Sequence, residues 1–558
     1  PEDFEAIRFF VDRVHLIAPG FQITPTNAQA VTRICVALDG LPLALELAAT
    51  QLKYMTVDEL LAQLDEHMHL TWTGNHRFPG QHDSLDKVVV WSYDLLDSGA
   101  RRLMRSLGVF NGGFTLGSAR AVHTAVADDD VASQLRTLVN ASLLERVDAD
   151  AAATRFTMLE TIRQFAAQRL HESDVCQAAH RAHAVYFLAL AQSVAGQSMH
   201  VGVHSQLAVL DAEDDNLRAA LSWALENNAP GLAVGLGVAL GGYWVTRFRM
   251  QEGIAWLTRL IQLPACEETP AINARLHATL GRLLELSGDY QHAQTALTNA
   301  IALARAQAQA NEMALALSYM GLLTRTVGDS AGAKALFAES AMLYAQLRQR
   351  HGEVVNRAYT ANCHHDLGEL DSAEEQYRFA LDRAPGLDDA FINAYLLWRL
   401  SDNLAAQERV AESKELLVQA AARFTELQAF KALAGYAHVT AAQVAMANQD
   451  YPEMLRLFRV SLKHSLQTRF FWGYTYELSA CALAMAKLGR VTDGYTVTAF
   501  VDQAFRRAGA PLAHRQGLHD EVSRTAKTQL DAEVMAAAWQ RGMHMTLSEI
   551  TALTLADT

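Results

Sequence analysis

The chain has 558 residues and a formal charge of −14, because its 61 acidic side chains outnumber its 47 lysines and arginines. Half of the residues are hydrophobic and 19% are charged, which excludes a disordered polymer and allows about three to four domains of ~150 residues with buried cores. The negative charge argues against a chain whose main activity is to bind nucleic acid through its phosphates.

The composition also indicates the compartment. Five cysteines are widely separated and form no CxxC pair, so we expect neither a disulfide framework nor a structural zinc site, and a reducing cytoplasm fits best. The uncharged run at residues 227–246 is long enough to span a bilayer, yet its five glycines, two asparagines and one proline favour a buried helix and no membrane. The chain begins at Pro1 without a signal peptide, which favours a piece of a larger protein.

Residues 1–75 are predicted to form a helical domain. Helices are expected over about residues 5–15 and 27–38, and Gly40 followed by Pro42 marks the end of one helix and the first turn of the next. The segment Thr56-Val-Asp-Glu59 has the form of a capping box and predicts a further helix.

Residues 80–172 carry a pattern typical of a winged helix, in which several helices precede a short hairpin and one helix closes the unit. The expected helices are 85–96, 99–107, 116–123, 131–140 and 159–171, and the expected strands are 143–147 and 155–158. Winged helices read DNA in some proteins and serve as regulatory lids in others. The arginines here form no continuous stripe, and pairing with nearby acids such as Asp94 and Glu160 is favoured over DNA contact.

After about residue 172 the chain is predicted to be helical and repetitive. Gly-Asp or Gly-Glu pairs recur at a period of 40, and a small residue lies five positions after each glycine. The pairs begin at Gly288, Gly328 and Gly368, and the small residues are Ala293, Ala333 and Ala373. Gly253 lies one period earlier. Looser copies follow near Ala411, Met454 and Gly494, at spacings of 38, 43 and 40. In each repeat, we expect Gly to end one helix and the acid to favour the start of the next.

This pattern is typical of tetratricopeptide repeats, although its period exceeds their usual ~34 residues, and a HEAT-like array is the alternative. The sequence therefore predicts a mainly α fold: a helical domain, a winged helix and then a tetratricopeptide-like α-solenoid. Residues 180–265 are the expected helical lead-in and residues 266–558 the repeats, whose apolar faces must be buried by their neighbours.

No motif for enzymatic chemistry is found. The sequence has no GxxxxGK[ST], no GxGxxG after a strand, no GxSxG and no HExxH, so we expect no catalytic residue on this chain. Cys176, His180 and His183 share one helical face and could hold a metal, but no fourth ligand is identified. Packing against a neighbouring helix is the favoured interpretation, and no metal site is predicted.

Four segments resemble, in order, a known family. They are residues 27–50 (NAQAVTRICVALDGLPLALELAAT), 90–116 (VWSYDLLDSGARRLMRSLGVFNGGFTL), 155–170 (RFTMLETIRQFAAQRL) and 214–226 (DDNLRAALSWALE). They resemble STAND-type signal-transduction ATPases, which are related to NB-ARC regulators and include large bacterial transcriptional regulators of the LuxR-like type. In that family they belong to the helical segment behind the nucleotide-binding core, the start and end of the winged helix, and the start of the helical-repeat sensor.

The resemblance implies a nucleotide contact at Gly40, Leu41 and Pro42, which match a GxP motif whose proline packs near adenine. It places the phosphate-binding loop and the Mg²⁺-binding acid in a core upstream of Pro1. ATP or ADP with Mg²⁺ is therefore expected in the parent protein, and no tight binding by this chain alone. One departure is that many relatives have Met-His-Asp, with a histidine on the ADP phosphate, where this chain has Met158-Leu159-Glu160. Leu159 is given no nucleotide role.

The resemblance implies that the chain is the signal-sensing and regulatory portion of a regulator of transcription that is switched by ATP and ADP. An inducer or protein partner is expected on the repeat superhelix, self-association on activation, and DNA contact only through a module outside this chain. Any slow ATP hydrolysis would belong to the upstream core. The alternative is a non-enzymatic tetratricopeptide-like scaffold for protein–protein interaction; a DNA-binding winged helix with a regulatory repeat domain is a third interpretation.

Overall fold

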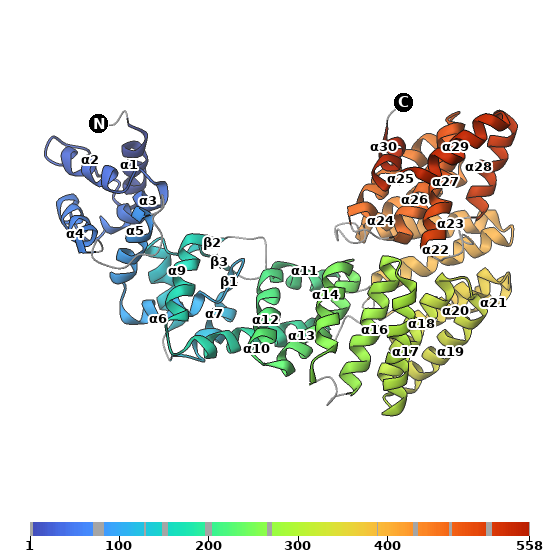
Figure 1. The fold of residues 1–558 in the computed structure, drawn as a ribbon, viewed down its shortest axis with the longest axis horizontal. Coiled ribbons are helices and arrows are strands. Elements are labelled where there is room, and N and C mark those ends of the chain that lie inside the picture. The colour runs from blue at the N-terminus through green and yellow to red at the C-terminus, as the bar shows by residue number, and fades with distance from the viewer. Residues whose placement is uncertain are drawn as a thin grey trace. The chain divides into compact units, whose positions relative to one another are not determined.

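The computed structural model describes residues 4–70, 83–127, 130–147, 154–195, 204–264, 270–387, 389–427, 434–467, 471–508 and 516–556. Within these ranges the regular structure is helical apart from three short strands (Figure 1), so the predicted mainly α fold is confirmed. Contacts divide the chain into two compact units, Pro1–Ala189 with Ala212–Ala229, and Leu190–Asp211 with Pro230–Thr558. Among the described residues, no helix combines the length and the apolar character needed to cross a bilayer.

The N-terminal helices of the first unit are α1 (Glu5–Ile17), α2 (Ala28–Ala37), α3 (Pro42–Gln51) and α4 (Val57–Leu70). Helix α1 buries Ile7, Phe10 and Val14, which the helical period places on one face, against α3. The predicted capping box forms at α4. The Glu59 N–H donates to Thr56 Oγ1 at 3.3 Å, and the Thr56 N–H donates to the Glu59 carboxylate at 2.7 Å.

The winged helix contains α5 (Asp83–Asp94), α6 (Ser98–Leu107), β1 (Phe114–Thr115), α7 (Leu116–His123), α8 (Val131–Asn140), β2 (Glu145–Val147), β3 (Arg155–Thr157) and α9 (Glu160–His171). The strands form an antiparallel sheet in the order β1-β3-β2, in which Phe114 and Arg146 both lie opposite Phe156. Both predicted strands are present and shorter than expected. The sequence does not predict β1, because two residues cannot display an alternating pattern.

Three helices lead from the winged helix toward the repeats: α10 (Cys176–Ala195), α11 (His204–Ala212) and α12 (Asp214–Glu226). The second unit continues with α13 (Pro230–Thr246), α14 (Met250–Ile261), α16 (Pro270–Ser287), α17 (Tyr290–Ala306), α18 (Ala310–Thr326), α19 (Ser330–Gln346), α20 (Arg350–Asp366), α21 (Leu370–Arg383), α22 (Ala390–Ala406), α23 (Val410–Leu427), α24 (Ala434–Ala447), α25 (Tyr451–Gln467), α26 (Phe471–Lys487), α27 (Val491–Ala508), α28 (Gln516–Gln529), α29 (Ala532–His544) and α30 (Leu547–Leu555). The uncharged run is the buried helix α13, as predicted.

From α16 to α20, successive helices end in the same turn every 20 residues. A residue with positive φ closes each helix, at Gly288 (89°), Ala308 (51°), Gly328 (97°), Arg348 (57°) and Gly368 (76°). The next residue returns its amide to the helix; the Asp289 N–H, for example, donates to the Leu284 carbonyl oxygen at 2.9 Å. Glycine marks only every second turn, so the sequence period of 40 is twice the period of the backbone.

The small-residue position repeats more strictly than the sequence predicts. Gly253, Ala293, Ala333 and Ala373 are buried, but Ala411 is exposed and the buried position is Ser413. The Ser413 hydroxyl donates to the Ser401 carbonyl oxygen at 2.8 Å, which is why a polar residue is accepted there. The copy at Ala411 is therefore wrong. The spacings from Ala373 through Ser413, Met454 and Gly494 are 40, 41 and 40.

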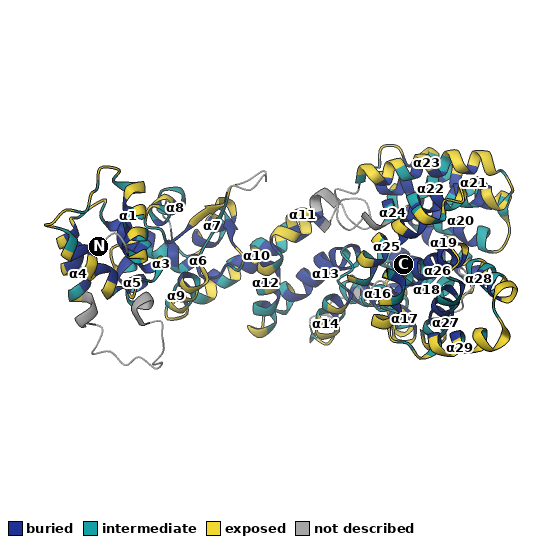
Figure 2. Cartoon of the chain, turned by 90° about the horizontal axis from the view of Figure 1, so that it is seen from above, coloured by how far each residue is buried: buried dark blue, intermediate teal, exposed yellow. Residues whose placement is uncertain are grey.

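The first helices of successive repeats form a layer of their own. Helix α16 packs beside α18, α18 beside α20, and α20 beside α22. Helix α26 also contacts α16, and a Cβ on Gly288 would lie 3.8 Å from the Phe471 ring. The layer thus returns to its own beginning within the second unit. Figure 2 shows exposed residues along α23 and α29 and buried residues where helices meet.

Candidate functional site

The predicted nucleotide contact lies between α2 and α3. Asp39 and Gly40 have positive φ angles of 53° and 65°, and the Gly40 N–H donates to the Cys35 carbonyl oxygen at 3.0 Å, which ends α2. Helix α3 begins at Pro42 with no side chain capping its first turn. Pro42 is exposed and Gly40 and Leu41 are half-buried, so a ligand could reach the proline ring. The nucleotide role of these three residues stays a prediction.

The segment in place of Met-His-Asp is occupied by contacts within α9. Leu159 precedes the helix, is 39% exposed and has no polar side-chain atom. The Glu160 carboxylate accepts hydrogen bonds from Arg163 at 2.6 Å and from Gln164 at 2.9 Å. These bonds, that of Arg163 first, lower the pKa of Glu160 to about 2. Arg163 therefore has the acidic partner that the sequence predicts.

The remaining charges of the winged helix are close to balanced. Residues 96–171 contain nine arginines and eight acidic residues. Arg101 donates to the Leu96 carbonyl oxygen at 2.9 Å and to that of Asp94, so it bonds to the backbone here and not to the Asp94 carboxylate. Arg136 is the only basic residue of α8, the helix before the hairpin. Phosphate binding needs an excess of such cations on one surface.

A buried polar cluster joins the winged helix to the start of α12. Its centre is the side chain of Asn216, which is fully buried. The Asn111 N–H donates to Asn216 Oδ1 at 2.8 Å, and Asn216 Nδ2 donates to the Gly113 carbonyl oxygen at 2.9 Å and to the Glu213 carboxylate at 2.7 Å. One amide therefore holds both ends of the turn at residues 111–113. We call Asn216, Glu213 and this turn the Asn216 joint.

The turn of the Asn216 joint requires two glycines. Gly112 and Gly113 have φ angles of 75° and 97°, which other residues rarely adopt. A Cβ on Gly113 would lie 2.8 Å from the Phe156 carbonyl oxygen in β3, and one on Gly112 would lie 3.0 Å from the Asp215 carboxylate. The close approach of α12 and β3 to this turn therefore depends on the absence of side chains.

Arg155 and His183 also contact the Asn216 joint. His183 is one of the three side chains that could hold a metal according to the sequence. Glu213 pairs with Arg155 of β3. His183 is buried, and its Nε2 lies 3.4 Å from Asn216 Oδ1; burial, partly opposed by that contact, lowers its pKa to about 3 and keeps it neutral. His180 instead stacks on Trp223, with ring centroids 6.0 Å apart. No group of three metal-binding side chains occurs in the part of the chain that the structure describes.

In the solenoid, ion pairs link neighbouring first helices. Arg275 of α16 pairs with Glu312 of α18 at 2.7 Å, and Arg325 of α18 pairs with Asp366 of α20 at 2.6 Å. Each pair is partly buried, and it joins residues separated by about one repeat. These contacts fix the register of one repeat on the next.

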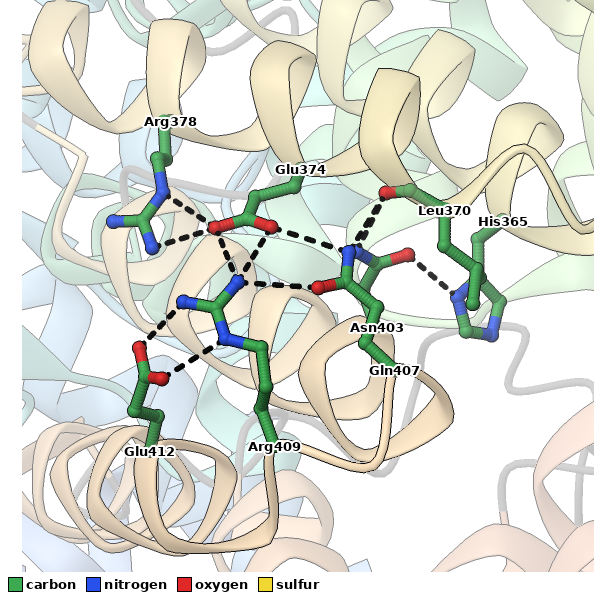
Figure 3. Close-up of polar contacts among 8 residues, drawn as sticks. All are labelled: His365, Leu370, Glu374, Arg378, Asn403, Gln407, Arg409 and Glu412. Atoms are coloured by element: carbon green, nitrogen blue, oxygen red, sulfur yellow. Dashed lines mark hydrogen bonds and ion pairs between the residues drawn. The ribbon is translucent and has the colours of Figure 1, made fainter.

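A second network ties the second helices to the layer (Figure 3). Glu374 of α21 accepts hydrogen bonds from Arg378 at 2.7 Å, from Gln407 at 3.1 Å and from Arg409 at 2.8 Å, and Arg409 also pairs with Glu412 of α23. Beside it, Asn403 of α22 donates to the Leu370 carbonyl oxygen at 2.9 Å. The network holds α21, α22 and α23 together, with the Glu374 carboxylate at its centre.

Comparisons with known proteins place the winged helix. Residues 96–171 match the winged helix-turn-helix domain family. Over 262 residues, 46% of this chain, the sequence is 36% identical to proteins of Mycobacterium bovis and Mycobacterium tuberculosis whose provisional names describe HTH-type transcriptional regulators. This stretch spans only 29% of those relatives. An uncharacterised M. tuberculosis protein is 35% identical over 189 residues, which cover 32% of this chain and 47% of that protein.

Among solved structures, the fold is similar to a STAND protein with a tetratricopeptide-repeat sensor from Pyrococcus horikoshii. The TM-score is 0.49 with 11% sequence identity, over 98% of this chain and 74% of that one. The family match at residues 96–171 confirms the expected winged helix. The more specific resemblance to NB-ARC-related and LuxR-like regulators stays a prediction.

The sequence contains the parts of the Asn216 joint but does not reveal their contact. Asn216 lies in the segment 214–226, and the Asn111-Gly112-Gly113 turn lies in the segment 90–116, about a hundred positions earlier. The available signal is the Gly-Gly pair, which indicates a turn with positive φ and a close approach. It does not say which distant side chain approaches.

Proposed function

We propose that this chain is the signal-sensing and regulatory portion of a transcriptional regulator whose output is switched by bound ATP or ADP. The observation that carries the proposal is the 36% identity over 262 residues to HTH-type transcriptional regulators, together with the winged-helix match at residues 96–171. The Asn216 joint supports it, because it gives a winged helix and a helical lead-in one shared buried contact. The parent protein is proposed to act in the cytoplasm.

In this proposal the chain has four parts. Residues 1–75 cover a nucleotide-binding core, 80–172 form the winged-helix lid, 180–265 lead into the superhelix, and 266–558 receive the signal. Gly40, Leu41 and Pro42 would contact the adenine side of ATP or ADP, which supplies the switch when bound. The ligands of the phosphates and of Mg²⁺ would come from residues outside this chain, which has no phosphate-binding loop of its own.

Regulation is then a shift between a closed, ADP-favoured arrangement and an open one favoured by the signal, with self-association following opening. Each ligand shifts the balance only by the difference between its affinities for the two arrangements. A change from 1% to 99% open needs about a 10⁴-fold preference for the open arrangement. The chain itself is proposed to carry out no catalysis.

The test is isothermal titration of ADP and ATP into this chain and into a version extended upstream by about 250 residues, roughly the length of one or two further domains. We expect tight binding only by the longer protein, and weaker binding when Pro42 is replaced by Ala. Absence of binding to both proteins would refute the nucleotide switch.

The second candidate is a non-enzymatic scaffold that holds protein partners on its repeats. The observation in its favour is the regular first-helix layer, since stacked repeats present long continuous surfaces to partners. An upstream GxxxxGK[ST] would favour the switch, and its absence would favour the scaffold.

A further inference from the structure

Tyrosines recur along the first helices of the repeats. Tyr319 and Tyr359 are 40 residues apart, in α18 and α20, and Tyr395 and Tyr436 are 41 apart, in α22 and α24. The two pairs occupy positions one helical turn apart in the 40-residue repeat, so all four lie on the same face of their helices. Tyr395 and Tyr436 also pack against Phe391, with ring centroids 6.1 Å and 5.1 Å away.

These side chains meet across helix boundaries. Trp398 of α22 lies between two of the tyrosines, with ring centroids 6.1 Å from Tyr395 and 6.2 Å from Tyr436, both edge to face. Asn362 of α20 donates to the Tyr395 hydroxyl at 2.8 Å. We call Tyr319, Tyr359, Tyr395, Trp398 and Tyr436 the tyrosine cluster.

The electrostatics indicate that the cluster also reaches α16. Burial raises the pKa of Tyr319, of Tyr359 and of Tyr436, the last to about 12. Arg282 of α16 opposes the rise in pKa at each of these three tyrosines. The packing gives the geometry: Tyr359 and Tyr395 pack against one core cluster, and Tyr395, Trp398 and Tyr436 pack against another. Side chains from α20, α22 and α24 therefore adjoin one another.

Hydrogen-bonding groups in this place are unused. The hydroxyls of Tyr319, Tyr359 and Tyr436 have no hydrogen-bond partner among the described residues. The Nε1 atom of Trp398 is buried and also lacks a partner there. A buried polar atom without a partner, such as this indole N–H, is rare in folded proteins, and a bound ligand is one reason for it. The three hydroxyls are not fully buried, so a ligand could reach them.

The charges around the cluster are already neutralised. Every arginine of α16, α18, α20 and α22 pairs with a carboxylate, except Arg350 at the start of α20, which donates to a carbonyl oxygen, and α24 carries no charged residue. The pairs are Arg275–Glu312, Arg282–Glu285, Arg325–Asp366, Arg357–Glu353 and Arg399–Asp402. An anion or a cation would have to break one of these partly buried pairs, which is costly.

We propose that the tyrosine cluster binds an uncharged small molecule that has a flat ring and several hydroxyl groups. The ring would pack against the faces and edges of the tyrosines and Trp398, as aromatic groups do in ligand sites. The ligand hydroxyls would exchange hydrogen bonds with the free phenols and the indole N–H. The inference rests on the proposed function, in which the repeats receive a signal.

The experiment compares two probes that differ in one charge, p-nitrophenyl β-D-glucoside and p-nitrophenyl β-D-glucuronide. Binding to the full chain is measured without nucleotide by saturation-transfer NMR and calorimetry. We expect the glucoside to bind at least about tenfold more tightly than the glucuronide, because the carboxylate meets only paired arginines. Tyr359→Phe and Tyr436→Phe should each weaken glucoside binding about 3- to 10-fold, the effect of one lost hydrogen bond.

A third variant tests the charge argument directly. Asp402→Asn leaves Arg399 without its carboxylate and should tighten glucuronide binding about tenfold while changing glucoside binding little. The matched control is Tyr54→Phe, since Tyr54 is 70% exposed in the helical domain and should leave both affinities unchanged. Circular dichroism checks that each variant is folded.

The proposal is overturned if the glucoside does not bind below about 10 mM, a few kcal/mol of affinity, or if both probes bind the native chain equally. It is also overturned if the folded tyrosine variants bind like the native chain. The nucleotide switch is tested separately by the ADP titration. Probe binding without nucleotide binding by the extended protein keeps the cluster and refutes the switch, and the reverse result refutes the cluster alone.

Discussion

The Asn216 joint and the repeat layer differ in how far apart in sequence their polar contacts reach. In the joint, one amide holds a turn about a hundred residues away, and both glycines of that turn are required by its geometry. In the layer, pairs such as Arg325–Asp366 recur between the first helices of neighbouring repeats, and each links one repeat only to the next. A single change should therefore release the joint completely, whereas the layer should lose its stability in small steps.

The largest effect is expected from Asn216→Ala. The change leaves the Gly113 carbonyl oxygen and the Asn111 N–H without a buried partner. It also removes one partner of the Glu213 carboxylate, which keeps its pair with Arg155, so it should destabilise the first unit by about 3 kcal/mol. Amide hydrogen exchange should accelerate in α12 and around residues 108–116 together. Asn140→Ala, at an exposed position at the end of α8, is the matched control and should change little. Faster exchange in α12 alone would mean that the two segments are not coupled.

The first unit marks the limit of what could be predicted here from sequence. The helices, the hairpin and the capping box at Thr56 were accessible because each depends on residues within a few positions. The joint was not, since Asn216 and Gly113 meet only after the winged helix has folded. The nucleotide contact that the resemblance implies stays a prediction, because an exposed proline at a helix start, such as Pro42, is common without a ligand.

The next effect, in the solenoid, is expected from Glu374→Ala. The carboxylate accepts hydrogen bonds from three side chains, but it is close to the surface, so about 1 to 2 kcal/mol of local stability should be lost. Exchange should accelerate in α21, α22 and α23, while α16 to α19 stay protected. If distant repeats opened equally, the solenoid would behave as one cooperative body and the contrast with the joint would fail.

The same residue predicts a dependence on pH. Burial tends to raise the pKa of Glu374, but the hydrogen bonds from Arg378, Gln407 and Arg409 outweigh it and lower that pKa below the usual 4.5. The stabilisation is therefore present above pH 4.5 and is lost as the pH falls through the lowered pKa. The difference in exchange protection between the native chain and Glu374→Gln should be full at pH 7 and should vanish under acid conditions. A constant difference would assign the effect to packing rather than charge.

The repeat period shows why the solenoid was predicted better than the joint. Gly288, Gly328 and Gly368 recur at 40 residues because each of these turns has a positive φ, which favours glycine. The same backbone requirement therefore gives the same residue type in several repeats. The exception also has a local cause. Ser413 takes the place of the small apolar residue because its hydroxyl donates to the backbone. The repeat therefore lacks an alanine at this position, and the sequence pattern indicates the nearby Ala411 in its place.

The smallest effects should come from the turns themselves. A Cβ on Gly368 would meet nothing within 4 Å, so Gly368→Ala tests backbone strain alone and should cost about 1 kcal/mol. Ala308 adopts the same kind of turn with φ of 51°, and Ala308→Gly should therefore stabilise it by up to about 0.5 to 1 kcal/mol. Exchange in the helices flanking each turn measures both changes. Opposite signs would show that one backbone rule governs both kinds of turn in the solenoid, whereas a loss of stability in Ala308→Gly would mean that the Ala308 methyl group contributes more by packing than its backbone costs.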